Sequence, residues 1–478
     1  MSLLAIDIET FSDVDLPKCG VYAYTNSPLF QILLFAYAFD DEPTQVVDLA
    51  CGEKLPNRVL EALENETVTK TAFNAAFERT CISRHLGRQL SPVSWQCTAV
   101  QSAMLALPLT LDGVGEVLNI KRKKLREGVA LLRYFSMPCK PTKANGGRTR
   151  NRPEDAPEMW ERFKAYCIRD VDAEREIREK LLNYPIPESE MELYRLDQEI
   201  NDRGIMVDQQ LAAQAVRCDA AFKAGATAQA QQLTGLANPN SLAQVKGWLA
   251  ERGVEVDSLD KKAIKSLLPQ ATGEVREMLM LRLLLGKTSV KKYEAIQRSV
   301  CSDGRVHGLL QFYGANRTGR WAGRLVQVQN LPQNHIPDLA LARSLVKRGE
   351  FERVEMLYDS TPGVLSELIR TAFVPKPGCR FIVADFAAIE ARVLAWFSGE
   401  QWRLDTFEQG GDIYCASASK MFHVPVEKHG QNAHLRAKGK VAELALGYGG
   451  SVGALTSMGA LDMGLAEEEL QPLVDQWR

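Results

Sequence analysis

The sequence predicts an α/β domain, followed by a helix-rich region and then by a region of mixed α+β structure. Three observations support this division. Residues 1–185 alternate strand-like and helix-like segments, as an α/β layer fold does. Residues 186–300 are helix-rich, with Ala, Gln, Leu and Lys dominating. Residues 301–478 return to mixed patterns, so we expect three domains with these boundaries.

Local patterns predict the elements of each region. In the first region, strands are expected at residues 2–8, 31–39, 45–49 and 68–73, and a long helical stretch at 153–182. The prolines within residues 185–187 mark the boundary that follows. In the second region, residues 238–241 (Asn-Pro-Asn-Ser) form a turn and an N-cap before another helix. In the third region, we expect a strand at residues 380–386 and helices at 388–398, 413–422 and 432–446.

Composition places the chain among ordinary globular proteins, with 45% apolar and 25% charged residues. The longest apolar run, residues 32–39, is far shorter than the ~20 residues of a membrane helix. Asp7 and Glu9 interrupt the N-terminal apolar stretch, which is therefore unlike a signal peptide. The ten cysteines form no C-x-x-C pair, which argues against a zinc site or a disulfide framework. We therefore expect a cytoplasmic protein with no membrane association.

The net charge of −2 neither requires nor excludes a nucleic-acid partner. Basic residues are concentrated locally, in residues 121–126 and again in residues 140–152. Runs of this kind are most often solvated helix ends or loops. Because an acidic metal site would offset a basic DNA track, the charge balance permits a nucleic-acid enzyme without indicating one.

Three pairs of polar side chains in the first region have a spacing that suits metal-dependent phosphodiester cleavage. The pairs are Asp7 and Glu9, Asn74 and Glu78, and Tyr166 and Asp170. Residues two apart on a strand share a face, and so do residues four apart on a helix. Two acids on one strand face are unfavourable without a cation, and Mg²⁺ prefers carboxylate oxygens. Each pair alone is more often a strand end or a helix face, but two-metal cleavage needs such a set together.

The three pairs resemble the motifs of DnaQ-like 3′→5′ exonucleases in their family A proofreading form. These motifs are D-x-E, N-x-x-x-D and Y-x-x-x-D, and they match residues 7–9, 74–78 and 166–170. The resemblance implies that two Mg²⁺ (or Mn²⁺) ions are held by Asp7, Glu9 and Asp170. It also implies that Tyr166 orients the attacking water.

The second of these motifs shows one departure from the family. Glu78 stands where the family usually has Asp, which shifts the carboxylate by ~1 Å but keeps its charge. We therefore expect Glu78 to act as a further ligand and activity to survive. The resemblance assigns Asn74 to contact with DNA.

A second set of polar and charged residues lies in the third region. Asp385 ends the expected strand, and Glu390 opens the helix after it. Arg436 and Lys440 are four apart on another helix, with Tyr448 eight residues further on, so the three form a roughly continuous stripe. Taken alone, Asp385 is adequately explained as a helix N-cap and the Arg–Lys pair as a solvated helix face.

The segment around Asp385 resembles motif A of family A DNA polymerases, D-Y-S-x-I-E-x-R, and the later helix resembles motif B, R-x-x-x-K-x-x-x-[FY]-G-x-x-Y-G. The resemblance implies that Asp385 is a catalytic metal ligand and that Glu390 excludes the 2′-hydroxyl of ribonucleotides. It further implies that Arg436, Lys440 and Tyr448 bind the incoming dNTP.

Three positions depart from these polymerase motifs. Phe386 replaces the tyrosine of motif A, which removes only a hydroxyl. Leu444 and Ala445 replace an aromatic residue and a glycine of motif B, which bears on stacking of the incoming base and not on neutralisation of the triphosphate. A P-loop at residues 286–288 is excluded, because Leu281 occupies the position of the required first glycine.

Shorter matches extend the resemblance over nearly the whole chain, most closely to the compact phage or prophage type. Thr318 and Arg320 belong to a T-G-R element, and Gln329 and Asn330 to an L-Q-N-[IL]-P element, which contact the primer–template in the family. The resemblance implies an RNase H-like exonuclease domain, a helical thumb and a partial α+β palm and fingers. The implied partners are primer–template DNA, single-stranded 3′ ends and dNTPs, with two ions in each active site.

The third polymerase motif, H-D-E, supplies a second metal-binding aspartate in the family, and His-Asp-Glu does not occur in this sequence. We therefore expect a C-terminally incomplete polymerase that extends primers poorly. Two alternatives stay open at this point. In the first alternative, the chain acts only as a 3′→5′ exonuclease. In the second, it is a non-catalytic DNA-binding remnant.

Overall fold

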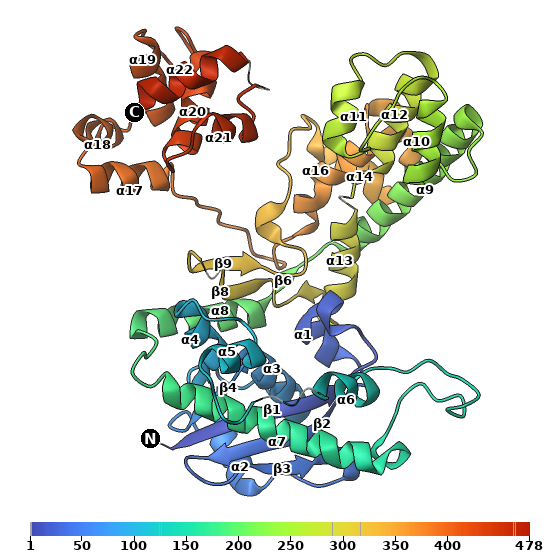
Figure 1. Ribbon diagram of the computed structural model, residues 1–478, viewed down its shortest axis with the longest axis vertical. Helices are drawn as coiled ribbons and strands as arrows, with labels where there is room; N and C mark the ends of the chain where they lie inside the picture. The colour runs from blue at the N-terminus through green and yellow to red at the C-terminus, as the bar shows by residue number, and fades with distance from the viewer. Residues whose placement is uncertain are drawn as a thin grey trace. The chain divides into compact units, whose positions relative to one another are not determined.

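The computed structural model describes residues 2–123, 125, 127–288, 290–315, 317–461, 463 and 465–478. Lys124 and Arg126, which belong to the basic run 121–126, lie outside the described residues. The chain forms two compact units, Met1–Arg380 and Phe381–Arg478, and each is described by itself (Figure 1). None of the described helices combines the length and the apolar character that crossing a membrane requires.

The first unit begins with a five-stranded mixed sheet in the order β3-β2-β1-β4-β5. Its strands are β1 (Leu3–Phe11), β2 (Gln31–Phe39), β3 (Gln45–Asp48), β4 (Thr69–Ala72) and β5 (Trp95–Cys97). The first three pair in antiparallel fashion, whereas β4 runs parallel to both β1 and β5. The sequence pattern predicted the first four strands to within a few residues, and β5 was not expected.

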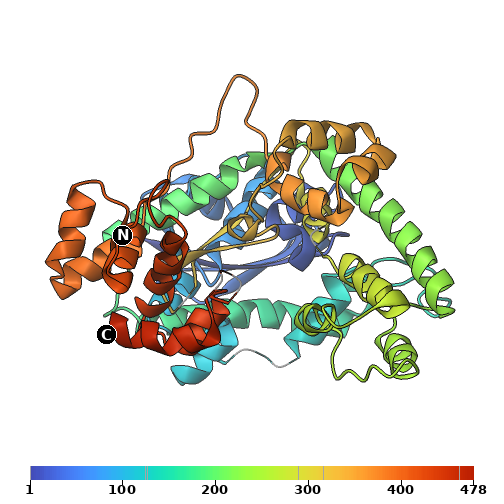
Figure 2. The same cartoon turned by 90° about the horizontal axis from the view of Figure 1, so that it is seen from above.

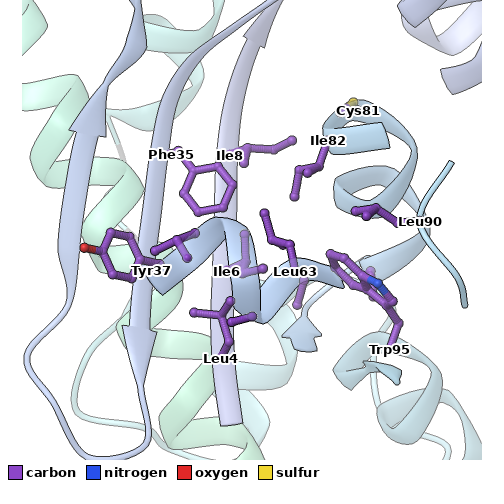
Figure 3. Close-up of a cluster of buried hydrophobic side chains, with 14 of the residues drawn as sticks. Leu4, Ile6, Ile8, Phe35, Tyr37, Leu63, Cys81, Ile82, Leu90 and Trp95 are labelled. Carbon is purple, nitrogen blue, oxygen red and sulfur yellow. The ribbon is translucent and has the colours of Figure 1, made fainter. Parts of the chain in front are cut away.

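Strand β1 is the middle strand of the sheet, and its side chains alternate between two buried faces. Leu4, Ile6 and Ile8 join one core cluster, beside Ile82 of α3 (Ala75–Leu86). Figure 3 shows these three side chains between the rings of β2 and the residues of α3. Ala5 faces the opposite cluster, which contains residues of α7 (Pro157–Lys180). Asp7 and Glu9 are therefore carried on the α7 side of the sheet.

Helix α7 crosses this second face of the sheet and contacts β1, β2 and β3 (Figure 1). The predicted helical stretch at 153–182 is divided into a 3₁₀ turn, η2 (Pro153–Asp155), and α7 itself. The division has a local cause, since Ala156 precedes Pro157 and takes a non-helical conformation with φ −156° and ψ 72°. Pro157 then begins the helix at the position where a missing N–H does no harm.

The other elements of this part are short and surround the sheet. They are α1 (Leu16–Asn26), η1 (Leu49–Cys51), α2 (Asn57–Glu64), α4 (Thr98–Met104), α5 (Leu111–Val117) and α6 (Gly128–Phe135). Part of the basic stretch 140–152 has structural partners here. Arg148 pairs with Asp155 at 2.6 Å, and the Arg150 guanidinium lies 3.9 Å from the centre of the Phe11 ring.

The middle of the chain is helical, as predicted. Its elements are α8 (Glu188–Arg203), β6 (Ile205–Met206), α9 (Gln209–Thr234), α10 (Leu242–Ala250), α11 (Lys261–Leu267), α12 (Gly273–Leu285) and α13 (Lys291–Ser299). Ser241 caps α10 by accepting a hydrogen bond from the Gln244 N–H, which confirms the turn expected at 238–241. Gly286 follows the helix α12 rather than a strand, in keeping with the exclusion of a P-loop.

Helices in the last part of the first unit pack against α9. This part comprises β7 (Arg305–Val306), the hairpin β8 (Leu310–Ala315) and β9 (Arg320–Gly323), η3 (Val328–Asn330), α14 (Leu339–Arg348), α15 (Phe351–Leu357), α16 (Thr361–Leu368) and η4 (Ile369–Ala372). Helix α9 packs against α14 and α16, which Figure 2 shows beside it. Asp208 caps α9 through the Leu211 N–H and also binds Arg343 and Lys347 of α14, which fastens the two helices together.

The regular elements of the second unit, among its described residues, are all helices. Its helices are α17 (Ile389–Ser398), α18 (Gln401–Glu408), α19 (Ile413–Phe422), α20 (Leu435–Leu446), α21 (Val452–Ser457) and α22 (Glu467–Trp477). Three of these were predicted at 388–398, 413–422 and 432–446. Helix α20 ends at Leu446, before Gly449 with its φ of +75°, so the end predicted at residue 446 is confirmed.

The strand predicted at residues 380–386 is wrong. These residues have no regular structure, and Ile382, Val383 and Phe386 are 86%, 89% and 78% exposed. An apolar run forms a strand only when another strand satisfies its backbone N–H and C=O groups. Within the described residues, no strand pairs with this segment.

Candidate functional site

The two acids of β1 meet a thiol of α7. One ligand atom each from Asp7, Glu9 and Cys167 lies within 4.8 Å of the others. Glu9 and Cys167 are buried, whereas Asp7 is only half-buried, so the group reaches the surface at Asp7. The Cys167 Sγ lies 3.5 Å from Asp7 Oδ2 and 3.7 Å from the Asp7 carbonyl oxygen. The spacing of two along β1 thus places both carboxylates over the same turn of α7.

Tyr166 and Asp170 join this group from α7. Both residues are buried, and the Tyr166 hydroxyl is close to the acidic side chains of β1. The pKa of Tyr166 is raised, first by burial and then by the negative charges of Asp170, Glu9 and Asp7. A hydrogen bond to Asp170 adds to this effect. The phenol therefore keeps its proton at neutral pH and is able to donate a hydrogen bond.

Glu78 approaches from α3, in the first turn of that helix. It is 5% exposed, and its pKa lies well above the usual range, first because of burial and then because of the charge of Asp7. Within the described residues, no donor forms a hydrogen bond with Glu78 Oε2. The structure thus brings together Asp7, Glu9, Glu78, Tyr166 and Asp170, from three separate elements.

This donor set fits a divalent cation. Four carboxylates gathered in a largely buried space repel one another, and a cation removes both the repulsion and the unmet bonding capacity of Glu78 Oε2. Oxygen donors of this kind suit hard ions such as Mg²⁺ or Mn²⁺. The residues present therefore fit the metal that the motifs implied.

Sequence reasoning missed three residues at this site. Cys167 lies inside the third motif, but its pattern gives no role to that position. Glu174, one turn after Asp170, is a further buried acid whose pKa is raised by burial and which accepts a hydrogen bond from Thr98. Gly128 begins α6, and a Cβ atom there would overlap the Tyr166 ring. Only the tertiary contact between α6 and α7 reveals why this glycine is needed.

We expect Gly128→Ala to slow 3′-end trimming by about tenfold to a hundredfold, because a small displacement of an aligned group has effects of that size. The added methyl would overlap the Tyr166 ring, which must therefore move. Single-turnover trimming of a 3′-labelled oligonucleotide measures the effect. The control is Gly247→Ala in α10, where a Cβ meets nothing within 4 Å. Equal trimming by both variants would show that Tyr166 does not depend on this contact.

A cavity of about 680 Å³ lies beside the second motif in the first unit. Asn74 and Phe77, which flank the start of α3, line one side, while Tyr313 and Arg324 of the β8–β9 region line another. The wall also contains several more aromatic side chains, namely Tyr22, Phe73, Tyr194 and Phe312. Asn74 itself is exposed at the N-terminal end of α3. The cavity thus offers flat apolar faces and a cationic group near the acidic cluster.

A buried ion pair holds this region together. Arg79, the residue after Glu78, lies 2.7 Å from Asp202 of α8, and its side chain is 1% exposed. The same guanidinium donates to the Leu90 carbonyl at 2.9 Å, and Tyr22 donates to Asp202 at 2.6 Å. The helix that carries Glu78 is thereby tied to α8, which the motif pattern did not indicate.

The β8–β9 hairpin is attached to α8 by Asp197. Its carboxylate accepts hydrogen bonds from the Trp321 indole at 2.8 Å, from Gln198 at 2.9 Å and from Asn201 at 3.1 Å. Burial raises the pKa of Asp197 to about 6, although these donors oppose the shift. The hairpin is therefore held on the body of the first unit by a buried polar network.

The four residues assigned to primer–template contact all lie at the surface of this region. Thr318 is in the hairpin turn, where its N–H bonds the Ala315 carbonyl at 2.9 Å, and Arg320 begins β9. Gln329 and Asn330 are exposed in η3. Gly323 leaves room for the Gln329 side chain, since a Cβ there would overlap it.

In the second unit, Arg436 of α20 is held in place by Asp412. Its guanidinium lies 2.7 Å from Asp412 Oδ2 and 5.2 Å from the centre of the Tyr414 ring. Asp412 also caps α19, accepting hydrogen bonds from the Tyr414 and Cys415 N–H groups. Burial alone would raise the pKa of Asp412, but the hydrogen bonds from Arg436 and the backbone lower it. The negative charge of Glu390, in the first turn of α17, also acts on Tyr414 of α19 and raises its pKa, although burial is the larger cause.

The remaining predicted residues of this unit are more exposed. Lys440 lies at the surface of α20, and Tyr448, after the end of that helix, is 69% exposed. Between them, Glu443 is buried and binds both Arg403 and Ser417, which anchors α20 against α18 and α19. Asp385 is exposed within the irregular segment after Arg380. Of the predicted set, Arg436 lies against the Tyr414 ring, and the charge of Glu390 acts on the same side chain.

Comparisons with known proteins agree on one family. The sequence model for DNA polymerase family A matches residues 209–477. The DNA polymerase of Bacillus phage SP02 is 58% identical over all of this chain, which spans 74% of that relative. DNA polymerase I of Chloroflexus aurantiacus is 37% identical over 109 residues, which are 23% of this chain and 11% of that protein.

A solved structure shares the fold at low sequence identity. It is the POL domain of Pol1 from M. smegmatis in complex with DNA primer-template and dNTP. The match has a TM-score of 0.62 at 19% identity and covers 100% of this chain and 72% of the other.

Proposed function

Because this chain belongs to DNA polymerase family A, we propose that it joins a 3′→5′ exonuclease site to the primer, template and nucleotide contacts of that family. One observation supports the exonuclease above all. Side chains from β1, α3 and α7, which are far apart in sequence, converge as one acidic cluster beside a buried tyrosine. The fold class that we propose for this part is RNase H-like, as the mixed sheet order suggests.

The roles of the cluster residues follow from their chemistry. Asp7, Glu9 and Asp170 would hold two Mg²⁺ or Mn²⁺ ions, with Glu78 as a further ligand. These ions, when bound, supply the charge that activates water and stabilises the leaving oxygen in phosphodiester cleavage. Tyr166 keeps its proton and orients the attacking water by a hydrogen bond.

The neighbouring cavity suits the terminal nucleotides of a single strand. Bases stack on aromatic side chains, and a cationic group attracts the phosphate backbone. Phe77, Tyr313 and Arg324 provide these features, and Asn74 stands between the cavity and the helix of Glu78. We therefore assign the cavity to the 3′ end of single-stranded DNA.

The polymerase contacts are assigned to the other predicted residues. Thr318, Arg320, Gln329 and Asn330 would contact primer–template DNA from the exposed hairpin region. Lys440, Arg436 and Tyr448 would bind the dNTP, with Glu390 beside its sugar and Asp385 as the metal ligand of the transfer reaction. Arg436 is already paired with Asp412 at 2.7 Å, so nucleotide binding would require the two to share or exchange partners.

A second function, exonuclease without polymerase, is favoured by one specific contrast. The acidic cluster of the first unit is assembled, whereas Asp385 lies exposed in a segment without regular structure. The two functions differ in what they do to the same DNA end.

A single assay with a 3′-recessed, labelled primer separates these functions. In Mg²⁺ without dNTPs, we expect the purified chain to shorten the primer, and EDTA to stop the reaction because the cluster needs its cations. With dNTPs present, net lengthening supports polymerase activity, and continued shortening supports the exonuclease alone. A primer that stays intact under both conditions would contradict the proposed exonuclease.

A further inference from the structure

Cys167 lies among the predicted metal ligands but belongs to no motif. It follows Tyr166 and precedes Asp170 on α7, and its thiol is buried with 0% exposure. Among the described residues, it is the thiol that forms a group of potential ligand atoms with two carboxylates, those of Asp7 and Glu9. We propose that Cys167 is a metal ligand for thiophilic divalent cations such as Cd²⁺, which it binds together with Asp7 and Glu9.

The geometry supports a shared site rather than a separate one. The Cys167 Sγ lies 3.5 Å from Asp7 Oδ2, so a cation held by Asp7 is within reach of the sulfur after a small adjustment. Glu78 supplies an independent indication of a ligand, since its side chain is 5% exposed and no described donor bonds its Oε2. The negative charge of Asp7 raises the pKa of Glu78, second to burial, so this carboxylate is within electrostatic reach of the same group.

The thiol has different roles with hard and soft cations. Hard ions such as Mg²⁺ prefer oxygen donors, so with them the thiol keeps its proton and donates a hydrogen bond to Asp7. Soft ions prefer thiolate sulfur. When Cd²⁺ binds, the S–H bond breaks, the proton leaves to solvent, and a sulfur–cadmium bond forms without any change in oxidation state. The site therefore discriminates between cations by which of its atoms bind.

A cadmium titration of the full chain, with CdCl₂ alone, tests this proposal. The exposed thiols Cys51 and Cys379 are first replaced by serine to lower the background. We expect a saturable near-ultraviolet thiolate-to-cadmium absorption band in this parent, and its loss in Cys167→Ser. Affinity for Cd²⁺ should fall by roughly tenfold to a hundredfold. Binding of Mn²⁺, followed by its magnetic resonance signal, should change by less than about threefold, because oxygen donors dominate there.

Two further variants complete the design. Cys97→Ser removes another buried thiol, outside the group, and should keep the band. Asp7→Asn should weaken Cd²⁺ binding, because the carboxylate shares the cation with the sulfur. Cys167→Ala replaces Cys167→Ser if circular dichroism shows that the serine variant does not fold. The proposal is overturned if the parent shows no saturable band, if the band survives loss of Cys167, or if Asp7→Asn binds Cd²⁺ as the parent does.

This inference rests on the proposed exonuclease site, with which it shares Asp7 and Glu9. Each of the two hypotheses can nevertheless be contradicted by an experiment that leaves the other intact. Cadmium binding is measured without DNA, and trimming is measured in Mg²⁺. A chain that binds Cd²⁺ through Cys167 but trims no DNA contradicts the proposed function alone. A chain that trims DNA but shows no band dependent on Cys167 contradicts the present inference alone.

Discussion

Asp7→Ala is expected to reduce 3′-end trimming by at least ~10³-fold, which corresponds to about 4 kcal/mol of lost transition-state stabilisation. Asp7 is the most exposed member of the acidic cluster and lies within 4.8 Å of the ligand atoms of Glu9 and Cys167. Its charge also acts on Glu78, Tyr166 and Cys167, so it influences residues of both α3 and α7. Removing it takes away both a ligand and the charge that attracts the cation.

The measurement is the single-turnover rate of trimming on a 3′-labelled oligonucleotide in saturating Mg²⁺. A matched control is Glu179→Ala, which removes an exposed acid from the C-terminal part of α7. We expect the control to trim at the parent rate, and both variants to unfold at the parent temperature. The assignment of the cluster is refuted if Asp7→Ala trims within about tenfold of the parent under these conditions.

The largest expected effect on stability comes from Arg79→Met. The Asp202 carboxylate is only 10% exposed, and this change removes its charge partner. The Tyr22 hydroxyl is then its remaining hydrogen-bond donor. Breaking a buried pair on one side lowers the free energy of unfolding by about 3–5 kcal/mol. Because Arg79 also bonds the Leu90 carbonyl, that group loses its donor as well. Urea unfolding of the parent and the variant, followed by circular dichroism, measures the difference.

Two comparisons make this prediction specific. Arg353→Met removes the exposed partner of Glu350 on α15, and exposed pairs of this kind contribute about 1 kcal/mol or less. Adding Asp202→Asn to Arg79→Met should restore part of the lost stability, since the uncompensated charge is then gone. A loss below about 1 kcal/mol for Arg79→Met would mean that the pair is not buried in solution.

The sequence patterns were most informative where the chemistry is local. Strand β2 begins and ends at the predicted residues, because nine residues of high strand propensity lie between turns. The N-cap at Ser241 and the end of α20 before Gly449 were likewise predictable from short-range rules. Membership in DNA polymerase family A was predicted from the resemblance of several segments to motifs of that family, and it is confirmed by the family match and by the phage relative.

The predicted strand at 380–386 failed for a reason that lies outside the segment. Its apolar pattern satisfies every local criterion for a strand, but a strand also needs a neighbour to bond its backbone. Val383, at 89% exposure, shows that within the described residues this neighbour is absent. No inspection of residues 380–386 alone could reveal this.

The sequence by itself identified the family of the chain, because several of its segments resemble motifs of that family, and its two- and four-residue spacings indicated which side chains share a face. Only the tertiary structure showed that Asp7, Glu78 and Asp170 converge from three elements, since their distance depends on how β1, α3 and α7 pack. It also revealed Gly128 against Tyr166 and Cys167 against Asp7. A glycine that makes room and a thiol that donates a hydrogen bond leave no periodic signal, because their partners are far away in the chain.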